Sequence, residues 1–226
     1  MSRIGMFAVL AAVLALAGCD GVNSDVTATS ADGAKTINGA VNVPAGSHTG
    51  GIGTVNGSVS VGENAVVGSV HAVNGPIELA AHALAQSVAG VNGGVTVGRE
   101  AHVAEGITTV NGGISLEEGA EVSGMVRNVN GPISLTRAHV AGGLRTVSGD
   151  IEIAGESHVE GGIVVQRAGW FNTDSRKPRI VIGPGAVVSG ELRFERPVEL
   201  FVSEGASVGP ITGATAVRFA GDKPAA

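Results

Sequence analysis

The sequence predicts an all-β fold, a single-stranded, three-sided parallel β-helix (β-solenoid) with about 18–19 residues per coil and roughly nine coils. Three observations predict it. A Val-Asn-Gly triplet or a close variant recurs at steps of 18 or 19 residues. Aliphatic residues recur every six positions within each step. Glycine is abundant, at 37 residues, whereas only 3% of residues are aromatic, which suits thin aliphatic layers better than a core of large rings.

The triplets mark one corner of each coil. Self-similarity at a fixed period is the signature of a solenoid. The Asn or Ser of each triplet forms a row for which we considered two roles. The row could be a comb of amides that binds a ligand, or a structural ladder in which Asn tolerates the corner conformation and stacked amides hydrogen-bond to each other. The structural role is favoured because the following residue is always Gly. The row consists of Asn38, Asn56, Asn74, Asn92, Asn111, Asn130 and Ser148.

The six-residue period defines the sides. Three sixes make one turn, and alternation within a short strand turns every second residue inward. We therefore expect the aliphatic slots, including Val55, Val73 and Val91, to face the core and to stack coil on coil at about 4.8 Å. One side stacks Val59, Ile77, Val95, Ile114, Ile133 and Ile151, and the next stacks Ala65, Ala83, Ala101 and Ala120.

The N-terminus has the features of an export signal. Residues 1–18 contain Arg3, an apolar stretch over 4–16 and small residues at the end, the pattern of a secretory signal peptide. Leu16-Ala17-Gly18-Cys19 resembles the lipobox of bacterial lipoproteins, which implies lipidation of Cys19, the only cysteine. The alternative is an ordinary signal peptide with an incidental cysteine. We expect an exported protein that is lipid-anchored to the inner or outer membrane, with residues 19–35 as a flexible tether.

The repeat is interrupted near the C-terminus. We place the β-solenoid at residues 36–219, with an inserted loop at 168–178, capping coils at 179–219 and a loose tail at 220–226. The loop holds Trp170 and Phe171 beside Arg176 and Lys177. Either these residues contact a partner, or the two rings fold back over one side of the solenoid.

Motifs for catalysis, metal binding or cofactor binding are not found, so we predict no enzyme activity, no metal site and no cofactor. The formal charge of −6 argues against nucleic acid as a partner. His102 and His158 occupy equivalent slots three coils apart, roughly 14 Å by the strand spacing, which is too far for shared chelation.

Two family resemblances follow from the repeat. Val61-Gly62-Glu63-Asn64-Ala65-Val66 resembles the repeat of hexapeptide acyltransferases, which implies a left-handed β-helix and, in many members, a catalytic His. The 18-residue coil with Gly corners is similar to bactofilins, which implies self-association into polymers. We expect a non-enzymatic, membrane-anchored lipoprotein with a structural or adhesive role. A carbohydrate- or peptidoglycan-binding solenoid is the alternative, and an envelope polysaccharide or protein is the expected partner; an acyltransferase is the third hypothesis.

Overall fold

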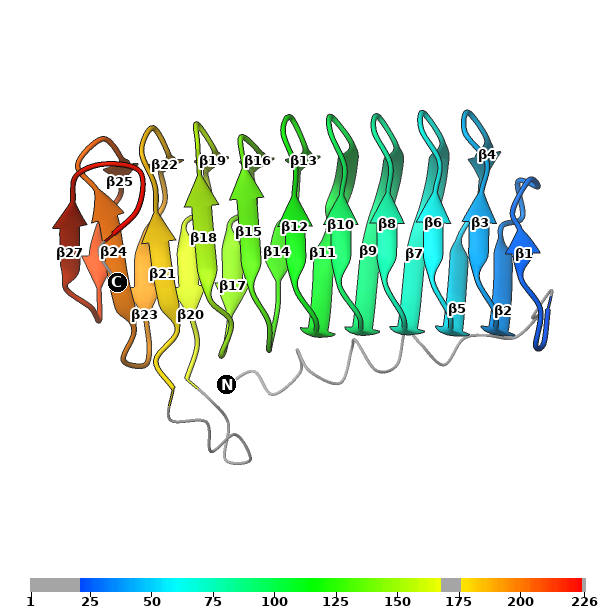
Figure 1. Ribbon diagram of the computed structural model, residues 1–226, viewed down its shortest axis with the longest axis horizontal. Coiled ribbons are helices and arrows are strands. Elements are labelled where there is room, and N and C mark those ends of the chain that lie inside the picture. The colour runs from blue at the N-terminus through cyan, green and yellow to red at the C-terminus, as the bar shows by residue number, and fades with distance from the viewer. Residues whose placement is uncertain (1–20, 168–175, 225–226) are drawn as a thin grey trace.

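The computed structural model describes residues 21–167 and 176–224, which form one elongated parallel β-solenoid of about ten turns without a helix (Figure 1). Every strand pair is parallel. At about 4.8 Å per coil, ten turns make a rod about 45–50 Å long. The predicted fold is confirmed. No helix in the described ranges is long and apolar enough to cross a membrane.

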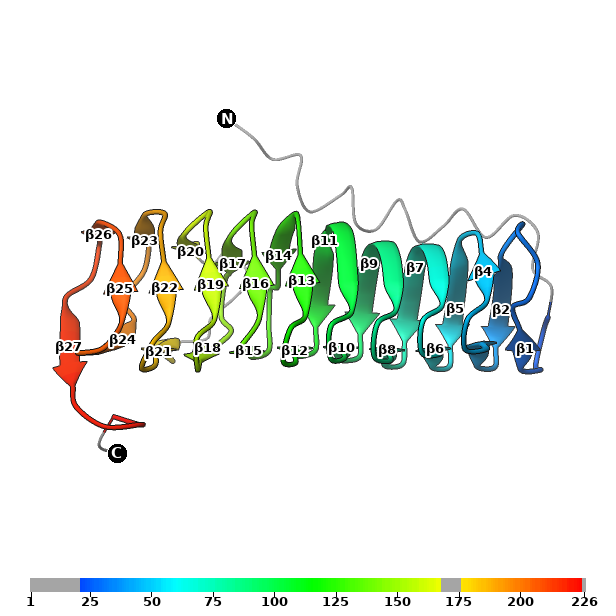
Figure 2. The same ribbon diagram turned by 90° about the horizontal axis from the view of Figure 1, so that it is seen from above.

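Each coil contributes strands to three rows, and Figure 2 shows the rows from a second side. The first row is an 11-stranded sheet. In sequence order it contains β1 (Val26–Thr27), β3 (Val41–Val43), β6 (Val59–Val61), β8 (Ile77–Leu79), β10 (Val95–Val97), β12 (Ile114–Leu116), β15 (Ile133–Thr136), β18 (Ile151–Ala154), β21 (Arg179–Ile182), β24 (Glu199–Ser203) and β27 (Ala216–Phe219).

The second and third rows form one 16-stranded sheet because three long strands bend through both rows. The long strands are β7 (Val66–Asn74), β9 (Leu84–Asn92) and β11 (His102–Asn111). The second row otherwise contains β4 (His48–Thr49), β13 (Glu121–Val122), β16 (His139–Val140), β19 (His158–Val159), β22 (Val187–Val188) and β25 (Ser207–Val208). The third row otherwise contains β2 (Ala34–Asn38), β5 (Ile52–Asn56), β14 (Met125–Arg127), β17 (Leu144–Thr146), β20 (Ile163–Val165), β23 (Leu192–Phe194) and β26 (Ile211–Thr212).

The core is a set of aliphatic columns along the rod. Ile77 pairs with Val59 on one side and with Val95 on the other, and all three are buried. The alanine column at the next corner is completely buried as well, as expected from the spacing. Because like residues stack on like, each coil presents its neighbour with a surface of matching shape, which is what a close-packed interior requires.

One expectation for the core is wrong. Val55, Val73 and Val91 are only half-buried, and the residue before each of them faces inward instead. The reason lies in the bend of the long strands. Val67 and Val70 of β7 both face inward although they are three positions apart, so the alternation changes phase at the bend. Every later inward position in that row is therefore shifted by one residue.

The predicted flexible tether over residues 19–35 is wrong for its described part, which forms a first coil. Val26 of β1 pairs with Val41, and Gly21 forms a bridge with Thr36. Ala28 is buried inside this coil. The chain is polar enough to be taken for a linker, and this coil is also shorter than the others, which hides it from a search at 18 residues.

The solenoid continues to the last described strand. β24 pairs with β21 and β27 pairs with β24, so residues 179–219 are further coils of the same stack. Phe194 and Phe219 bury their rings inside these coils. Phe201 instead faces outward, and the Arg179 guanidinium lies 5.0 Å from its ring centre.

Candidate functional site

The asparagine row is a continuous side-chain ladder. In each step the Nδ2 of one Asn donates to the Oδ1 of the preceding Asn, from Asn38 to Asn23 at 2.6 Å up to Asn130 to Asn111 at 2.9 Å. The side chains are exposed, but each inner Asn uses its amide nitrogen and oxygen within the row. The arrangement is the one expected of a structural ladder.

Two details of the ladder differ from expectation. The ladder begins one coil earlier than the triplets indicate, at Asn23, and the Val22-Asn23 dipeptide fifteen residues before Asn38 was the signal for it. The asparagines at 38, 56, 74, 92, 111 and 130 are also not in the left-handed region. That conformation belongs to the glycines that follow five of them, at positions 57, 75, 93, 112 and 131, such as Gly75 with φ of 151°, because a residue without Cβ fits there most easily.

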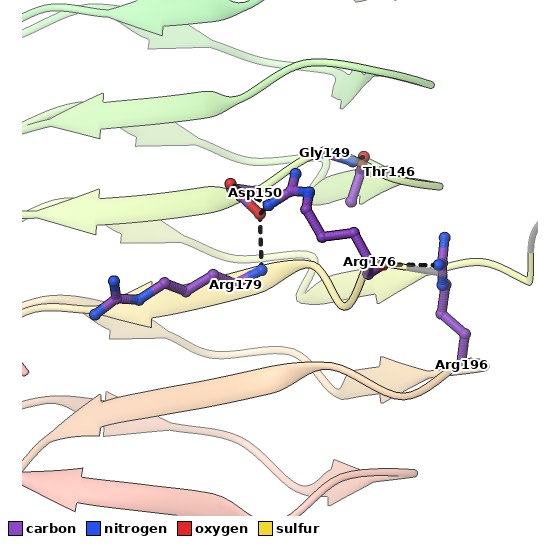
Figure 3. Close-up of polar contacts among 6 residues, drawn as sticks. All are labelled: Thr146, Gly149, Asp150, Arg176, Arg179 and Arg196. Atoms are coloured by element: carbon purple, nitrogen blue, oxygen red, sulfur yellow. Dashed lines mark hydrogen bonds and ion pairs between the residues drawn. The ribbon is translucent and has the colours of Figure 1, made fainter. Parts of the chain in front are cut away.

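The ladder stops at Ser148, where the side chain of Arg196, 48 positions later in the chain, makes the polar contacts at the corner. Nη1 of Arg196 donates to the carbonyl of Val147 at 3.0 Å and contacts the Ser148 hydroxyl at 3.2 Å. Its Nη2 donates to the carbonyl of Arg176 at 3.0 Å (Figure 3). Arg196 therefore joins the end of the ladder to the backbone at Arg176, just before β21.

Asp150 holds the segment that leads into β21. Its carboxylate accepts from Nη1 of Arg176 at 3.0 Å and from the backbone N–H of Arg179 at 2.8 Å, where β21 begins (Figure 3). Thr146 accepts from the N–H of Gly149 at 2.9 Å in the same corner. Both partners of the ion pair are exposed, so its contribution to stability is within about 1 kcal/mol. The contact fixes Arg176 and the base of β21 against the preceding coil.

Two of the four predicted partner-contact residues lie in the part of the chain that the structure describes. Arg176 and Lys177 are exposed at this base. Trp170 and Phe171 lie outside the described residues, as do Cys19 and the predicted signal peptide. The lipidation and the role of the two aromatic rings therefore stay predictions.

A second cluster was missed by the sequence analysis. His102, Glu121, His139 and His158 occupy one outward column of the second row on successive coils. His139 contacts Glu160 through Nε2 at 2.9 Å, and its ring lies edge-on to the ring of His158 at 5.6 Å. The signal was a shared pattern, a small residue, then the polar residue, then Val, which all four copies have.

This column contains a hydrolase-like contact. Nε2 of His102 lies 3.4 Å from the Ser123 hydroxyl and its Nδ1 lies 3.5 Å from a Glu121 carboxylate oxygen. A serine triad also needs oxyanion donors in a water-excluded site. Here the backbone N–H of Ser123 already donates to Val103, and the Glu121 side chain is 50% exposed. The geometry is that of a solvated polar network.

The pKa values of His71 and of the Glu118–Arg137 pair are shifted. Burial, with a smaller effect of the Lys35 charge, lowers the pKa of His71. Arg137 lowers the pKa of Glu118 through a hydrogen bond of 2.9 Å and through its charge. Neither group belongs to a metal-binding arrangement, since the described ranges contain no set of three His, Cys, Asp or Glu placed to hold a metal ion.

Comparison with protein-family models, with curated protein sequences and with solved structures gives no match for this chain.

Proposed function

We propose that the protein is a non-enzymatic lipoprotein whose rod-shaped solenoid has a structural or adhesive role in the bacterial envelope, held at the membrane through lipidated Cys19. The observation that supports this role most directly is the uninterrupted stacking of coils. The asparagine ladder alone links seven successive corners, and the aliphatic columns run beside it. Such a stack resists bending and holds its two ends at a fixed separation.

Close glycine contacts add to this stiffness. A Cβ at Gly75 would lie 1.9 Å from the carbonyl oxygen of Gly57, and a Cβ at Gly93 would lie 2.1 Å from that of Gly75. The corners are thus in backbone contact along the rod, with no side chain between them. A spacer or display rod requires such uniform contact along its length.

The first coil gives the proposed anchor a definite geometry. Since Gly21 already bridges Thr36, only two residue steps separate Cys19 from the solenoid, a reach of about 7 Å. Acyl chains on Cys19 would hold the first coil at the bilayer surface, and two or more chains make that attachment durable. The opposite end, at β27, would then project away from the membrane by about the rod length.

Two experiments test the proposal. Metabolic labelling with a fatty-acid analogue, followed by membrane fractionation, should label the wild type and leave Cys19→Ser unlabelled and soluble. An unlabelled wild type refutes the anchor.

The scaffold role is tested by removing residues 57–74, one complete 18-residue coil, which joins Asn56 to Gly75 in register. We expect this shorter rod to fold but to fail in complementing the envelope or adhesion defect of a deletion strain. Deletion of residues 57–65 should not fold, because it brings unlike columns together. If the shorter rod and the Cys19→Ser variant each restore the wild-type phenotype in full, a spacer role is refuted.

An acyltransferase or hydrolase is the competing class. The Ser123–His102 contact is the feature that such an activity would use. Turnover of an ester panel that disappears in both Ser123→Ala and His102→Ala would replace the structural proposal with an enzymatic one.

A further inference from the structure

The outer face of the third row has an arginine column in its C-terminal half. Arg127 of β14 pairs in register with Arg145 of β17, which pairs with Val164 of β20, which pairs with Arg193 of β23. Neighbouring strands lie about 4.8 Å apart, so Arg127 and Arg145 are one spacing apart and Arg193 follows after two. Arg127 and Arg193 are exposed and Arg145 is half-buried.

Two of these arginines have no acidic partner among the described residues. Nε of Arg127 donates only to the thioether sulfur of Met125, at 3.2 Å. Nε of Arg145 is covered and has no acceptor within residues 21–167 and 176–224. Arg193 contacts Glu195 at 3.4 Å, with both side chains largely in solvent. The positive charge of the column is therefore compensated only at its far end.

The fold gives no reason for this charge. Like charges directly opposite each other on neighbouring strands destabilise a sheet, by up to about 1 kcal/mol. The same outward position holds Ala89 and Thr108 on the two preceding coils, so small neutral residues fit there. Arg127 and Arg145 place two positive charges without an acidic partner among the described residues at a position where Thr108 fits on the preceding coil. Such a pair indicates a binding role.

The neighbouring corner extends the positive region. Arg196 contacts Ser148 at the end of the asparagine row, the exposed Arg167 follows β20, and the exposed Lys177 precedes β21. The acids nearby are Asp150, which binds Arg176, and Glu191 and Glu195. In a chain with a formal charge of −6, this region is a local reversal of sign, and clustered charge of one sign attracts ligands of the other.

We infer that this face binds an anionic polysaccharide whose carboxylates lie along the arginine column. Arginine presents a planar fork that matches a carboxylate with two hydrogen bonds. The column runs along the rod, with the first two arginines one strand spacing apart and the third two spacings further on. It therefore fits an extended polymer that carries repeated charges better than it fits a small molecule. The inference goes beyond the proposed structural role and does not depend on lipidation of Cys19.

Binding of the purified full chain to immobilised polygalacturonate tests the inference, with dextran as the neutral polymer. We expect retention on polygalacturonate that weakens as salt rises and no retention on dextran. The double variant R127T/R145T should lose about tenfold or more in affinity. Its thermal stability should equal or exceed that of the wild type, since the like-charge pair is gone.

The matched control is Arg99→Thr, which removes an exposed arginine at a different corner of the solenoid. We expect it to keep wild-type affinity. Equal losses in Arg99→Thr and in the double variant would show a general charge effect and overturn the site. Wild-type affinity in the double variant overturns it as well, and so does equal binding to duplex DNA or to vesicles of anionic lipid, because a glycan site should prefer the polyuronate.

Discussion

Replacing Gly75 by Ala tests whether the corners are in backbone contact. Two penalties add at this position. Gly75 has φ of 151°, a region in which a side chain costs about 1–3 kcal/mol. The new Cβ would also lie 1.9 Å from the carbonyl oxygen of Gly57, and overpacking of this kind costs about 1–3 kcal/mol or more. We therefore expect a loss of about 2–6 kcal/mol in the free energy of unfolding.

Two other glycines separate the penalties. Gly46 has φ of 67° with nothing within 4 Å of a built Cβ, so Gly46→Ala tests the backbone conformation alone, at about 1–2 kcal/mol. At Gly94 the Cβ would be 3.5 Å from the carbonyl oxygen of Gly113, an ordinary contact. Gly94→Ala should change stability by less than about 0.5 kcal/mol.

The measurements are thermal unfolding followed by circular dichroism and amide hydrogen exchange. At about 2–4 °C per kcal/mol for a chain of this size, Gly75→Ala should lower Tm by about 10 °C. Exchange should rise first at the Gly57 and Gly75 amides, which donate to Asn74 and Asn92 at 3.0 and 2.9 Å, because a solenoid can open locally. If Gly75→Ala is no more destabilising than Gly94→Ala, the backbones of successive corners are not in contact, and the close stacking of the coils is refuted.

Three further predictions follow from single side chains. Asn92→Ala removes the hydrogen bonds to Asn74 and from Asn111, at 2.8 and 3.0 Å, and should cost about 1–2 kcal/mol in chemical denaturation, whereas an unchanged midpoint would mean that the exposed ladder contributes nothing. Asn128→Thr should stabilise the chain by about 1 kcal/mol, because it removes a buried Oδ1 that has no hydrogen-bond donor among the described residues. The variant loses the hydrogen bond from Nδ2 to Thr109 at 2.9 Å, but its hydroxyl can replace the bond to the Gly112 carbonyl, as Thr54 donates to Gly39 at 2.9 Å. The same inward position holds Thr109 and Thr146 on the adjacent coils, and a lower Tm would contradict this prediction. His71→Gln should reduce acid sensitivity. The pKa of His71 in the folded chain is below 6.5, so the unfolded chain binds the proton more readily, and wild-type stability falls as pH drops from 6.5 through the lower folded value. The wild type should therefore lose more Tm than His71→Gln between about pH 7.5 and pH 5, and equal losses would exclude His71 as the cause.

Much of the solenoid could be predicted without coordinates because stacking repeats one environment along the chain. A residue such as Val59 meets the same neighbours as Ile77 one coil later, so the pattern Val59, Ile77, Val95 in the sequence is also the pattern in space. The period, the parallel pairing, the aliphatic and alanine columns and the corner asparagines all follow from this translation. The export signal and the lipobox resemblance are likewise local in sequence, and they stay predictions.

Other features depend on how the chain bends and where coils change length. The half-buried Val73 and the buried Ala72 exchange their expected places because the alternation changes phase inside β7. The first coil was missed because fifteen residues separate Asn23 from Asn38.

Contacts between coils of unequal length were also beyond the sequence. Glu121 and His139 lie between His102 and His158 in one column. The steps along this column are 19, 18 and 19 residues, so the register depends on how the longer coils fit the extra residue. Arg196 reaches Ser148 across 48 positions of the chain. A regular repeat determines which residues share a column. Where a residue is inserted, backbone geometry decides which side chain faces the neighbouring coil. The reason is that one added residue turns every following side chain of the strand to the opposite face.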